Sequence, residues 1–352
     1  TFVNDNAHHT VETIDLLRAI EKATGRNLTF LFDQYVYRGG HPDFKVTYAW
    51  DGDANLAKVT VEQTQVTGND KNKESFFDLR VPIGFGYINQ VDELKVFTVR
   101  VSEKEQSFYF PLEKKPDFIS FDVGNHYLKT VTLEYPIPEL KAQLLYDKNP
   151  VSRIYAAEAL AKKSSLEAVK ALSESLKNDG FWGVRVEVAK QLASVQLDQV
   201  FDTLVEYLSD ENPYVRRVIA QSLGKIKTNS SYKALKELSQ AGDASYYVEA
   251  AAATSIGSIA ATVGEDKPDE AEVIKLFENI LQSKAGWNEV LRNGAIAGLA
   301  ELKTSEAALN LILDYTKLGV PQPLRLGAIR ALGKISTGQS SANLERILER
   351  LS

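Results

Sequence analysis

The chain has 352 residues, of which 44% are hydrophobic and 25% are charged, and its formal net charge at pH 7 is -6. This length exceeds one typical hydrophobic core and predicts two or three domains. The acidic balance disfavours a nucleic-acid binder, and no apolar run approaches the roughly 18 residues of a membrane-spanning helix. Because cysteine is absent, disulfides and thiolate chemistry are excluded. We therefore expect a cytoplasmic protein without nucleic-acid or membrane partners.

The first ten residues are polar and carry no secretory signal. Methionine is absent from the whole chain, although an average chain of this length contains several. We expect an internal fragment or a processed product of a longer protein. The alternative is that modified methionines are missing from the sequence, in which case some spacings shift by one.

Residues 1–43 are predicted to be helical. Thr10 is the expected N-cap of a first helix and Gly25 its end. Two apolar stripes have helical spacing: Val11, Ile14, Leu17, Ala19 and Ile20, then Leu28, Leu31, Phe32, Tyr35 and Val36. Gly39, Gly40 and Pro42 end the second stripe. Such a short segment cannot enclose a core alone, so we expect it to pack on the next region or to belong to a larger domain.

Residues 44–135 are predicted to form an antiparallel β-sandwich. Apolar residues alternate with period two, and the turn Asp51-Gly52-Asp53 separates the first two strands. Seven short strands are expected: 44–50, 56–66, 75–83, 94–101, 106–112, 118–123 and 128–135. Gly84-Phe85-Gly86 is interpreted as a turn or bulge rather than a nucleotide loop.

Residues 136–352 are predicted to form an α-α superhelix of HEAT-like repeats. An arginine is followed by small or β-branched residues three and four positions later and by Leu or Ile seven positions later. The copies are Arg153, Ala156, Ala157, Leu160; Arg185, Val188, Ala189, Leu192; Arg216, Ile219, Ala220, Leu223; Glu249, Ala252, Ala253, Ile256; Arg292, Ala295, Ile296, Leu299; and Arg325, Ala328, Ile329, Leu332. The steps between copies are 32, 31, 33, 43 and 33 residues, which is typical of two-helix solenoid units.

Second helices are expected between the copies at 168–176, 200–208 and 307–315, and an insertion at 264–270. The recurring arginine is interpreted as structural, serving helix-end carbonyls or a neighbour's acid. Ala220 is expected where adjacent repeats meet, and Ser231 is expected to be exposed.

The sequence offers no catalytic constellation. The four histidines are His8, His9, His41 and His126, and no H-E-x-x-H, G-x-S-x-G or phosphate-binding glycine loop occurs. His8 and Glu12 are four positions apart, which we interpret as a solvated cap rather than a metal site. We therefore assign no catalytic, cofactor-binding or metal-binding residue and expect no cofactor in this chain.

Residues 10–46 resemble the end of the catalytic domain in zinc aminopeptidases of the aminopeptidase N family. The matching features are Thr24-Gly25, Leu28, Phe32-Asp33-Gln34-Tyr35-Val36, Gly40-His41-Pro42 and, further on, Gln63. Tyr35 replaces the family's usual Trp. The resemblance implies three parts: the helical tail of a catalytic domain (1–43), a β-sandwich (44–135) and a HEAT-like solenoid (136–352).

The resemblance implies that the zinc ligands and catalytic residues lie upstream of this chain, which would be inactive alone. Peptide substrates would bind in that upstream domain. The helical domain would cover the active site and restrict which substrates enter it. Two alternatives stay open. One is a scaffold derived from a peptidase, as in a transcription factor subunit associated with the TATA-binding protein that has lost the zinc residues. The other is a HEAT-repeat adaptor with protein partners on the solenoid.

Overall fold

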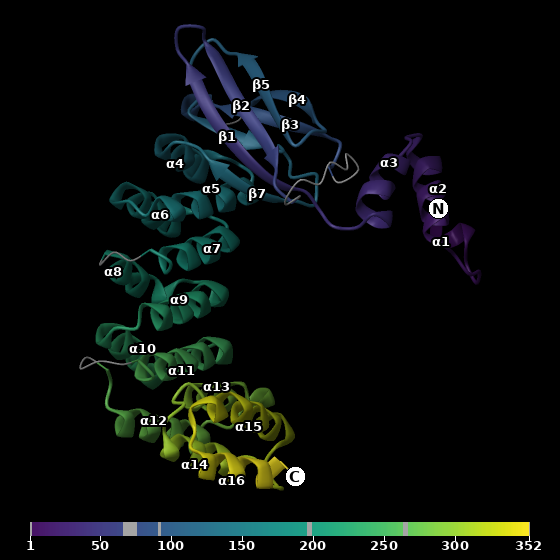
Figure 1. Ribbon diagram of the computed structural model, residues 1–352. Coiled ribbons are helices and arrows are strands. Elements are labelled where there is room, and N and C mark those ends of the chain that lie inside the picture. The colour runs from purple at the N-terminus through teal and green to yellow at the C-terminus, as the bar shows by residue number, and fades with distance from the viewer. Residues whose placement is uncertain (1, 66–75, 91–92, 196–198, 263–266, 352) are drawn as a thin grey trace. The chain divides into compact units, whose positions relative to one another are not determined.

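The computed structural model describes residues 2–65, 76–90, 93–195, 199–262 and 267–351. The chain forms two compact units, residues 1–155 and 156–352 (Figure 1). Helices, strands and a long series of helices follow one another in the predicted order, so the predicted fold class is confirmed. The expected strand end at Val66, strand start at Ser75 and insertion at 264–266 lie outside the described residues.

The first unit begins with the helices α1 (Phe2–Asp5) and α2 (Thr13–Thr24). Thr10 is not the N-cap. Glu12 takes this position because its side chain accepts the backbone N–H of Asp15, while the Asp15 carboxylate accepts the Glu12 N–H at 3.0 Å. Gly25 ends α2 in the left-handed conformation with φ 68°, as predicted.

The second predicted helix divides into α3 (Thr29–Phe32) and the π-helical turn η1 (Asp33–Tyr37). The Arg38 N–H donates to the Asp33 carbonyl oxygen, five residues earlier, at 3.0 Å. This wider turn changes the direction of Gln34 and Tyr35 relative to a regular α-helix.

All seven predicted strands are present. They are β1 (Asp43–Asp51), β2 (Leu56–Gln63), β3 (Leu79–Gly86), β4 (Lys95–Val101), β5 (Glu105–Pro111), β6 (Phe118–Phe121) and β7 (Thr130–Glu134). They form one sheet in the order β5-β2-β1-β7 and a second in the order β4-β3-β6. The buried rings of Phe44 and Phe121 lie 5.4 Å apart, and those of Phe85 and Phe110 lie 5.1 Å apart. Because each pair joins the two sheets, the predicted sandwich is confirmed.

Two details of the sandwich differ from the prediction. β1 and β7 pair in parallel, with Asp43 opposite Thr130, because side-chain alternation records which face of a strand is buried but not its direction. Gly84 and Gly86 lie within regular antiparallel pairing of β3 and not in a turn or bulge. A Cβ at Gly86 would lie 2.1 Å from the Phe118 ring, so this glycine makes room for a core aromatic residue.

After the sandwich come α4 (Ile137–Tyr146) and α5 (Pro150–Lys163), and the first compact unit ends within α5. The Ser120 and Ser152 hydroxyls lie 3.1 Å apart, joining β6 to the start of α5. The Glu139 carboxylate is buried in α4 and pairs with Lys115 at 2.7 Å.

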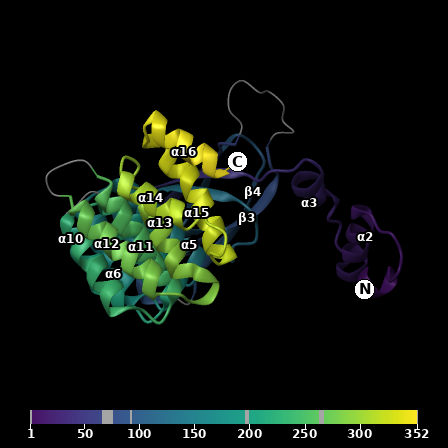
Figure 2. The same cartoon turned by 90° about the horizontal axis from the view of Figure 1, so that it is seen from below.

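The second unit is a stack of helix pairs, seen from the side in Figure 1 and turned by 90° in Figure 2. Its helices are α6 (Leu166–Asn178), α7 (Trp182–Leu192), α8 (Gln199–Glu206), α9 (Pro213–Ile226), α10 (Asn229–Ala241), α11 (Tyr246–Ala260), α12 (Glu270–Ser283), α13 (Val290–Leu299), α14 (Glu306–Asp314), α15 (Gln322–Ile335) and α16 (Ser341–Leu351). Short 3-10 turns lie at Tyr207–Ser209, Trp287–Glu289 and Ser336–Gly338. The three predicted second helices correspond to α6, α8 and α14.

The recurring small and aliphatic positions form the core of this stack. Every predicted residue three, four and seven positions after the recurring arginine or Glu249 is buried, except Ile329, which is half-buried. Ala220 is fully buried, as expected. Ser231 is also fully buried, contrary to the prediction, because it lies in the first turn of α10 with its hydroxyl 3.0 Å from that of the capping Thr228.

Candidate functional site

The histidines do not form a metal site in the described part of the chain, where no group of three or more His, Cys, Asp or Glu side chains is placed to hold an ion. His8 precedes α2 and has a left-handed backbone, so His8 and Glu12 do not share a helix face. His41 Nδ1 lies 3.4 Å from an Asp43 carboxylate oxygen at a partly exposed position. Within the described residues, the histidines are therefore not brought together as ligands of one ion.

Gln63 and Gln34, two residues of the family resemblance, meet at neighbouring backbone positions of the sandwich. Gln63 is fully buried, and its side-chain amide donates to the Phe77 carbonyl and accepts the Phe77 N–H, both at 2.8 Å. Gln34 accepts the Asp78 N–H at 2.5 Å. The ring of Tyr35 lies 5.1 Å from that of Phe77, and burial raises the pKa of Tyr35 to about 12. The helical tail is therefore attached to the sandwich through the motif residues.

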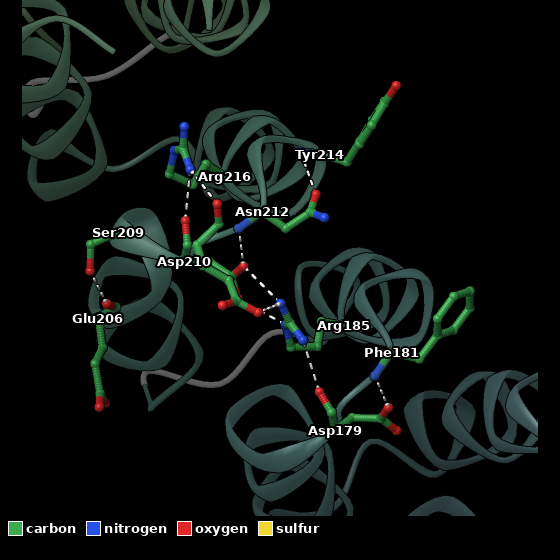
Figure 3. A network of polar contacts seen from close by, with 10 residues as sticks. Asp179, Phe181, Arg185, Glu206, Ser209, Asp210, Asn212, Tyr214 and Arg216 are labelled. Atoms are coloured by element: carbon green, nitrogen blue, oxygen red, sulfur yellow. Dashed lines mark hydrogen bonds and ion pairs between the residues drawn. The ribbon is translucent and has the colours of Figure 1, made fainter. Parts of the chain in front are cut away.

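Arg185 of α7 joins two successive loops of the solenoid, as Figure 3 shows. Its Nε and Nη2 donate to the two carboxylate oxygens of Asp210 at 2.9 and 3.0 Å, and its Nη1 donates to the Asp179 carbonyl at 2.9 Å. The hydrogen bonds that Arg185 donates to Asp210 raise the pKa of Arg185 further above its ordinary value. Arg185 is thus a permanent cation held by a bidentate carboxylate.

Arg216 repeats this arrangement one unit later. Its Nε and Nη2 donate to the Asp243 carboxylate at 2.7 and 2.8 Å, and its Nη1 donates to the Asp210 carbonyl at 2.8 Å. Asp210 therefore binds Arg185 through its carboxylate and Arg216 through its backbone (Figure 3). The predicted role of the recurring arginine, serving carbonyls and a neighbour's acid, is confirmed at both residues.

Glu249 occupies the arginine position in the next unit and makes the complementary contact. Its carboxylate accepts the backbone N–H of Asp243, six residues earlier, at 3.1 Å. Arg185 and Arg216 instead donate to the carbonyl six residues earlier. Equivalent loops of successive repeats are thus held by a backbone N–H in the copy with Glu249 and by a backbone C=O in the copies with Arg185 and Arg216.

The arginines of the other copies also donate hydrogen bonds to backbone carbonyls. Arg153 donates to the Asp147 carbonyl at 2.9 Å, and Arg325 donates to that of Thr316 at 3.2 Å. Arg292 pairs with Glu289 and donates to the Leu281 carbonyl at 3.2 Å. The arginine series stabilises the loops of the solenoid and is not arranged as a catalytic group.

A row of exposed aromatic side chains runs along the same repeats. Its members are Phe181, Trp182, Tyr214, Tyr246, Tyr247 and Trp287, which we call the aromatic row and which are 40–60% exposed. The rings of Trp182 and Tyr214 stack at 5.1 Å with an interplanar angle of 25°, and those of Tyr247 and Trp287 lie 6.4 Å apart. Large exposed aromatic groups in contact with one another are typical of binding surfaces.

A cavity of about 400 Å³ interrupts the row between α9 and α11. It is lined by Pro213, Tyr214, Arg217, Ser245 and Tyr247. The Arg217 guanidinium lies over the Tyr247 ring at 5.2 Å from its centroid. The cavity therefore combines aromatic faces with a cation, a chemistry suited to a ligand that is partly apolar and carries a negative group.

The sequence analysis did not predict the aromatic row. The signal was present, because Trp182, Tyr214 and Tyr247 lie two or three positions before the recurring Arg or Glu. It was missed because the repeat was defined by its buried positions, whereas these side chains lie on the surface at the start of each helix. The pattern that indicates the row is an aromatic residue two or three positions before the recurring Arg or Glu.

Comparison with known families identifies HEAT repeats over residues 169–257. A comparison with curated protein sequences finds no match. Among the helices of the described residues, none has the length and apolar character needed to cross a bilayer.

Among solved structures, the chain is similar to aminopeptidase A of Legionella pneumophila in complex with aspartic acid, with 13% identity and a TM-score of 0.49. That match covers 99% of this chain and 53% of the other, so this chain spans about half the length of that aminopeptidase. The complex of CpcE and CpcF of a Nostoc phycocyanin lyase has 20% identity and a TM-score of 0.40, covering 62% of this chain and 87% of the other. Human deoxyhypusine hydroxylase has 18% identity and a TM-score of 0.34, covering 61% and 89%.

Proposed function

We propose that this chain is the non-catalytic sandwich and helical-repeat portion of a zinc aminopeptidase, an enzyme that removes N-terminal residues from peptides. The observation that carries the proposal is the attachment of the helical tail to the sandwich. Gln34 and Gln63, which match the family at separate motifs, bind the adjacent backbone positions Asp78 and Phe77. Gln34 therefore joins the helical tail to Asp78, next to the residue that Gln63 of the sandwich binds.

The described residues do not fit a zinc site, because they hold no cluster of suitable ligands. In this proposal the metal and the catalytic groups belong to a domain upstream of Thr1. The contribution of this chain is then to support that domain through the helical tail, and to cover the active site and restrict peptide substrates through the repeats.

The test begins with the coding sequence upstream of Thr1, where an H-E-x-x-H motif followed by a further Glu is expected. The full-length protein should release the chromophore from aminoacyl 4-nitroanilides, lose this activity with a zinc chelator and regain it with added zinc. Residues 1–352 alone serve as the matched control and should be inactive. An upstream region without these ligands, or a full-length protein that is inactive with zinc, would reject the proposal.

A second candidate function is a protein-binding scaffold, which the aromatic row favours. The row exposes six large rings, whereas the neighbouring Arg185 and Arg216 are engaged with carboxylates of the solenoid itself. If the upstream region has degenerate zinc ligands, this function takes precedence. The upstream coding sequence and the 4-nitroanilide assay therefore also distinguish the aminopeptidase from the scaffold.

A further inference from the structure

We propose that the pocket lined by β4, β6 and the loop between α4 and α5 binds a primary alkylammonium group, from a lysine side chain of a partner protein or from a small aliphatic amine. All the described residues that line this pocket belong to the first compact unit. The proposal does not depend on peptidase activity. It rests on the composition of the pocket, on a buried carboxylate oxygen without a partner and on the contacts that distinguish one cation from another.

The pocket has a polar floor and apolar walls. Its volume is about 850 Å³, within the range of about 300–1,000 Å³ that is typical of small-molecule sites. Two of the lining residues are buried and form the floor, Ser120 of β6 and Asp147 at the end of α4. The walls contain four apolar residues that are half-buried or exposed, Leu94, Val96, Val123 and Pro150. Such a pocket suits an aliphatic chain that ends in a polar group.

Asp147 has a carboxylate oxygen without a partner. The residue is 3% exposed, and its Oδ1 accepts the Asn149 N–H at 2.8 Å. Its Oδ2 is buried and accepts no hydrogen bond from the described residues. Burial raises the pKa of Asp147 and outweighs the opposing effects of neighbouring amide and hydroxyl groups and of the Arg153 charge. A bound cation would offset this cost of burying the carboxylate.

The group missing from this cluster is a hydrogen-bond donor. Gln143, one turn before Asp147 in α4, donates through Nε2 to the Ser152 carbonyl at 3.2 Å, but its Oε1 is buried without a partner. The Ser152 hydroxyl lies 3.1 Å from that of Ser120. The atoms without partners here, Oδ2 of Asp147 and Oε1 of Gln143, are both acceptors. An ammonium group carries three donors and no acceptor, so it has the chemistry that these oxygens lack.

The contacts of Asp147 favour an ammonium group over a guanidinium or a divalent metal ion. A guanidinium binds best to both oxygens of one carboxylate, but Oδ1 is already engaged by Asn149. A divalent ion needs several protein ligands, and the part of the chain that the structure describes places no group of three His, Cys, Asp or Glu side chains to hold one. An ammonium group is a compact point charge, which one carboxylate oxygen and the Ser120 hydroxyl can accommodate.

The other charges of the lining do not oppose a cation. Glu93 and Lys148 are exposed lining residues of opposite charge, so they balance one another. Among the described lining residues, the Asp147 carboxylate is then the remaining charge. An anionic ligand is therefore disfavoured.

The test measures binding of small probes to residues 1–352 by saturation-transfer difference NMR. The probe n-butylammonium reproduces the end of a lysine side chain, n-butylguanidinium has a planar cation, and n-butanol has the same chain without charge. We expect n-butylammonium to bind at least about tenfold more tightly than n-butanol, because charged hydrogen bonds are the stronger ones. Equal affinities for these two probes, or tighter binding of n-butylguanidinium, would overturn the proposal. Absence of binding would overturn it as well and would leave Oδ2 to a water molecule.

A second comparison distinguishes the two sources of the ammonium group. Nα-acetyl-lysine N-methylamide carries this group together with the backbone of a lysine residue. Binding as tight as that of n-butylammonium would support a lysine of a partner protein, whereas binding of n-butylammonium alone would support a small free amine. Displacement of n-butylammonium by potassium chloride, but not by the same concentration of tetramethylammonium chloride, would assign the pocket to a monovalent metal ion and reject the proposal.

A charge variant locates the site. Asp147→Asn keeps the shape of the side chain and an acceptor for the Asn149 N–H. It should weaken n-butylammonium binding at least about tenfold and leave n-butanol binding unchanged. Glu211→Gln is the control, because it removes a negative charge from a side chain that is 88% exposed and outside the pocket, and it should not change either affinity. An unchanged affinity for n-butylammonium in Asp147→Asn would contradict the assignment.

A variant at an exposed position keeps the test decisive if Asp147→Asn folds poorly. Val96 lines the pocket and is 46% exposed, so Val96→Trp should fill part of the pocket and weaken the binding of n-butylammonium and n-butanol several-fold. Thr98→Trp is the matched control, because Thr98 is exposed on the same face of β4 and does not line the pocket. Equal affinities of the two tryptophan variants would place the binding elsewhere and overturn the proposal.

Discussion

The guanidinium of Arg216 and the carboxylate of Asp243, 27 positions apart in the sequence, form two parallel hydrogen bonds of 2.7 and 2.8 Å. The third contact of Arg216 is to the Asp210 carbonyl at 2.8 Å. One side chain therefore joins the loop before its own helix to the loop before the next repeat helix. This relationship makes the stability of the solenoid sensitive to single polar side chains.

Arg216→Ala should lower the free energy of unfolding by about 2–3 kcal/mol, because it leaves the Asp243 carboxylate buried without its partner. The two side chains are only 14% and 7% exposed. Lys317→Ala is the control, since Lys317 pairs with Asp314 at a site where both side chains are 61% exposed, and it should cost less than about 1 kcal/mol. Urea unfolding measures both, and equal losses would contradict the structural role of Arg216.

Asp243→Asn should destabilise the protein at neutral pH and much less in acid. Burial favours a higher pKa for Asp243, but hydrogen bonds from Arg216 and the Ser245 amide together with the charge of Arg216 outweigh it, so the pKa is lowered. The stabilisation is complete above the unfolded pKa of about 3.9 and is lost as pH falls through the lower folded pKa. Unfolding by urea at about pH 7 and pH 3 measures the change. A difference from wild type that grows in acid would contradict this sign.

Ala220→Leu should cost about 1–3 kcal/mol by overpacking. Ala220 is fully buried in α9, whereas Gln221 in the same helix is exposed. Gln221→Leu is therefore the matched control and should change stability by less than about 0.5 kcal/mol. Thermal unfolding compares the two, and similar melting temperatures for both variants would show that Ala220 has room for a larger side chain.

Gly257→Ala should destabilise the contact between α11 and α13. A Cβ at Gly257 would lie 2.2 Å from the Gly298 carbonyl oxygen, so two helix backbones would have to separate. Gly333→Ala in α15 is the control, because no atom lies within 4 Å of its added Cβ. That change should stabilise the protein by up to about 1 kcal/mol. Loss of stability in Gly333→Ala equal to that in Gly257→Ala would refute the role of the close helix contact.

Residues 1–43 should exchange their amide hydrogens faster than the repeats. Within described residues 2–41, only Leu17 and Phe32 are buried hydrophobic residues, and local stability follows the amount of buried apolar surface. Val11 is exposed and precedes α2. Hydrogen exchange followed by mass spectrometry measures this, and strong protection across residues 11–23 in a monomer would contradict it.

Much of the fold followed from local patterns in the sequence. The seven strands and the burial of residues such as Ala157, Ala189 and Leu223 were predicted because side-chain spacing reports which face of one element is buried. Gly25 was predicted as a helix end because a glycine tolerates the left-handed backbone found there. These properties involve residues close together in the chain, so local patterns were sufficient to predict them.

Contacts between distant elements could not be predicted from local patterns and are visible only in the folded chain. The parallel pairing of β7 with β1, the burial of Ser231, the choice of Asp243 as the partner of Arg216 and the joining of Trp182 with Tyr214 all depend on how complete elements pack. A repeat pattern predicts that the arginines and aromatic residues occupy equivalent positions. Whether those side chains touch depends on the distance and rotation between stacked helices, which are set by many small packing contacts and have no local signature.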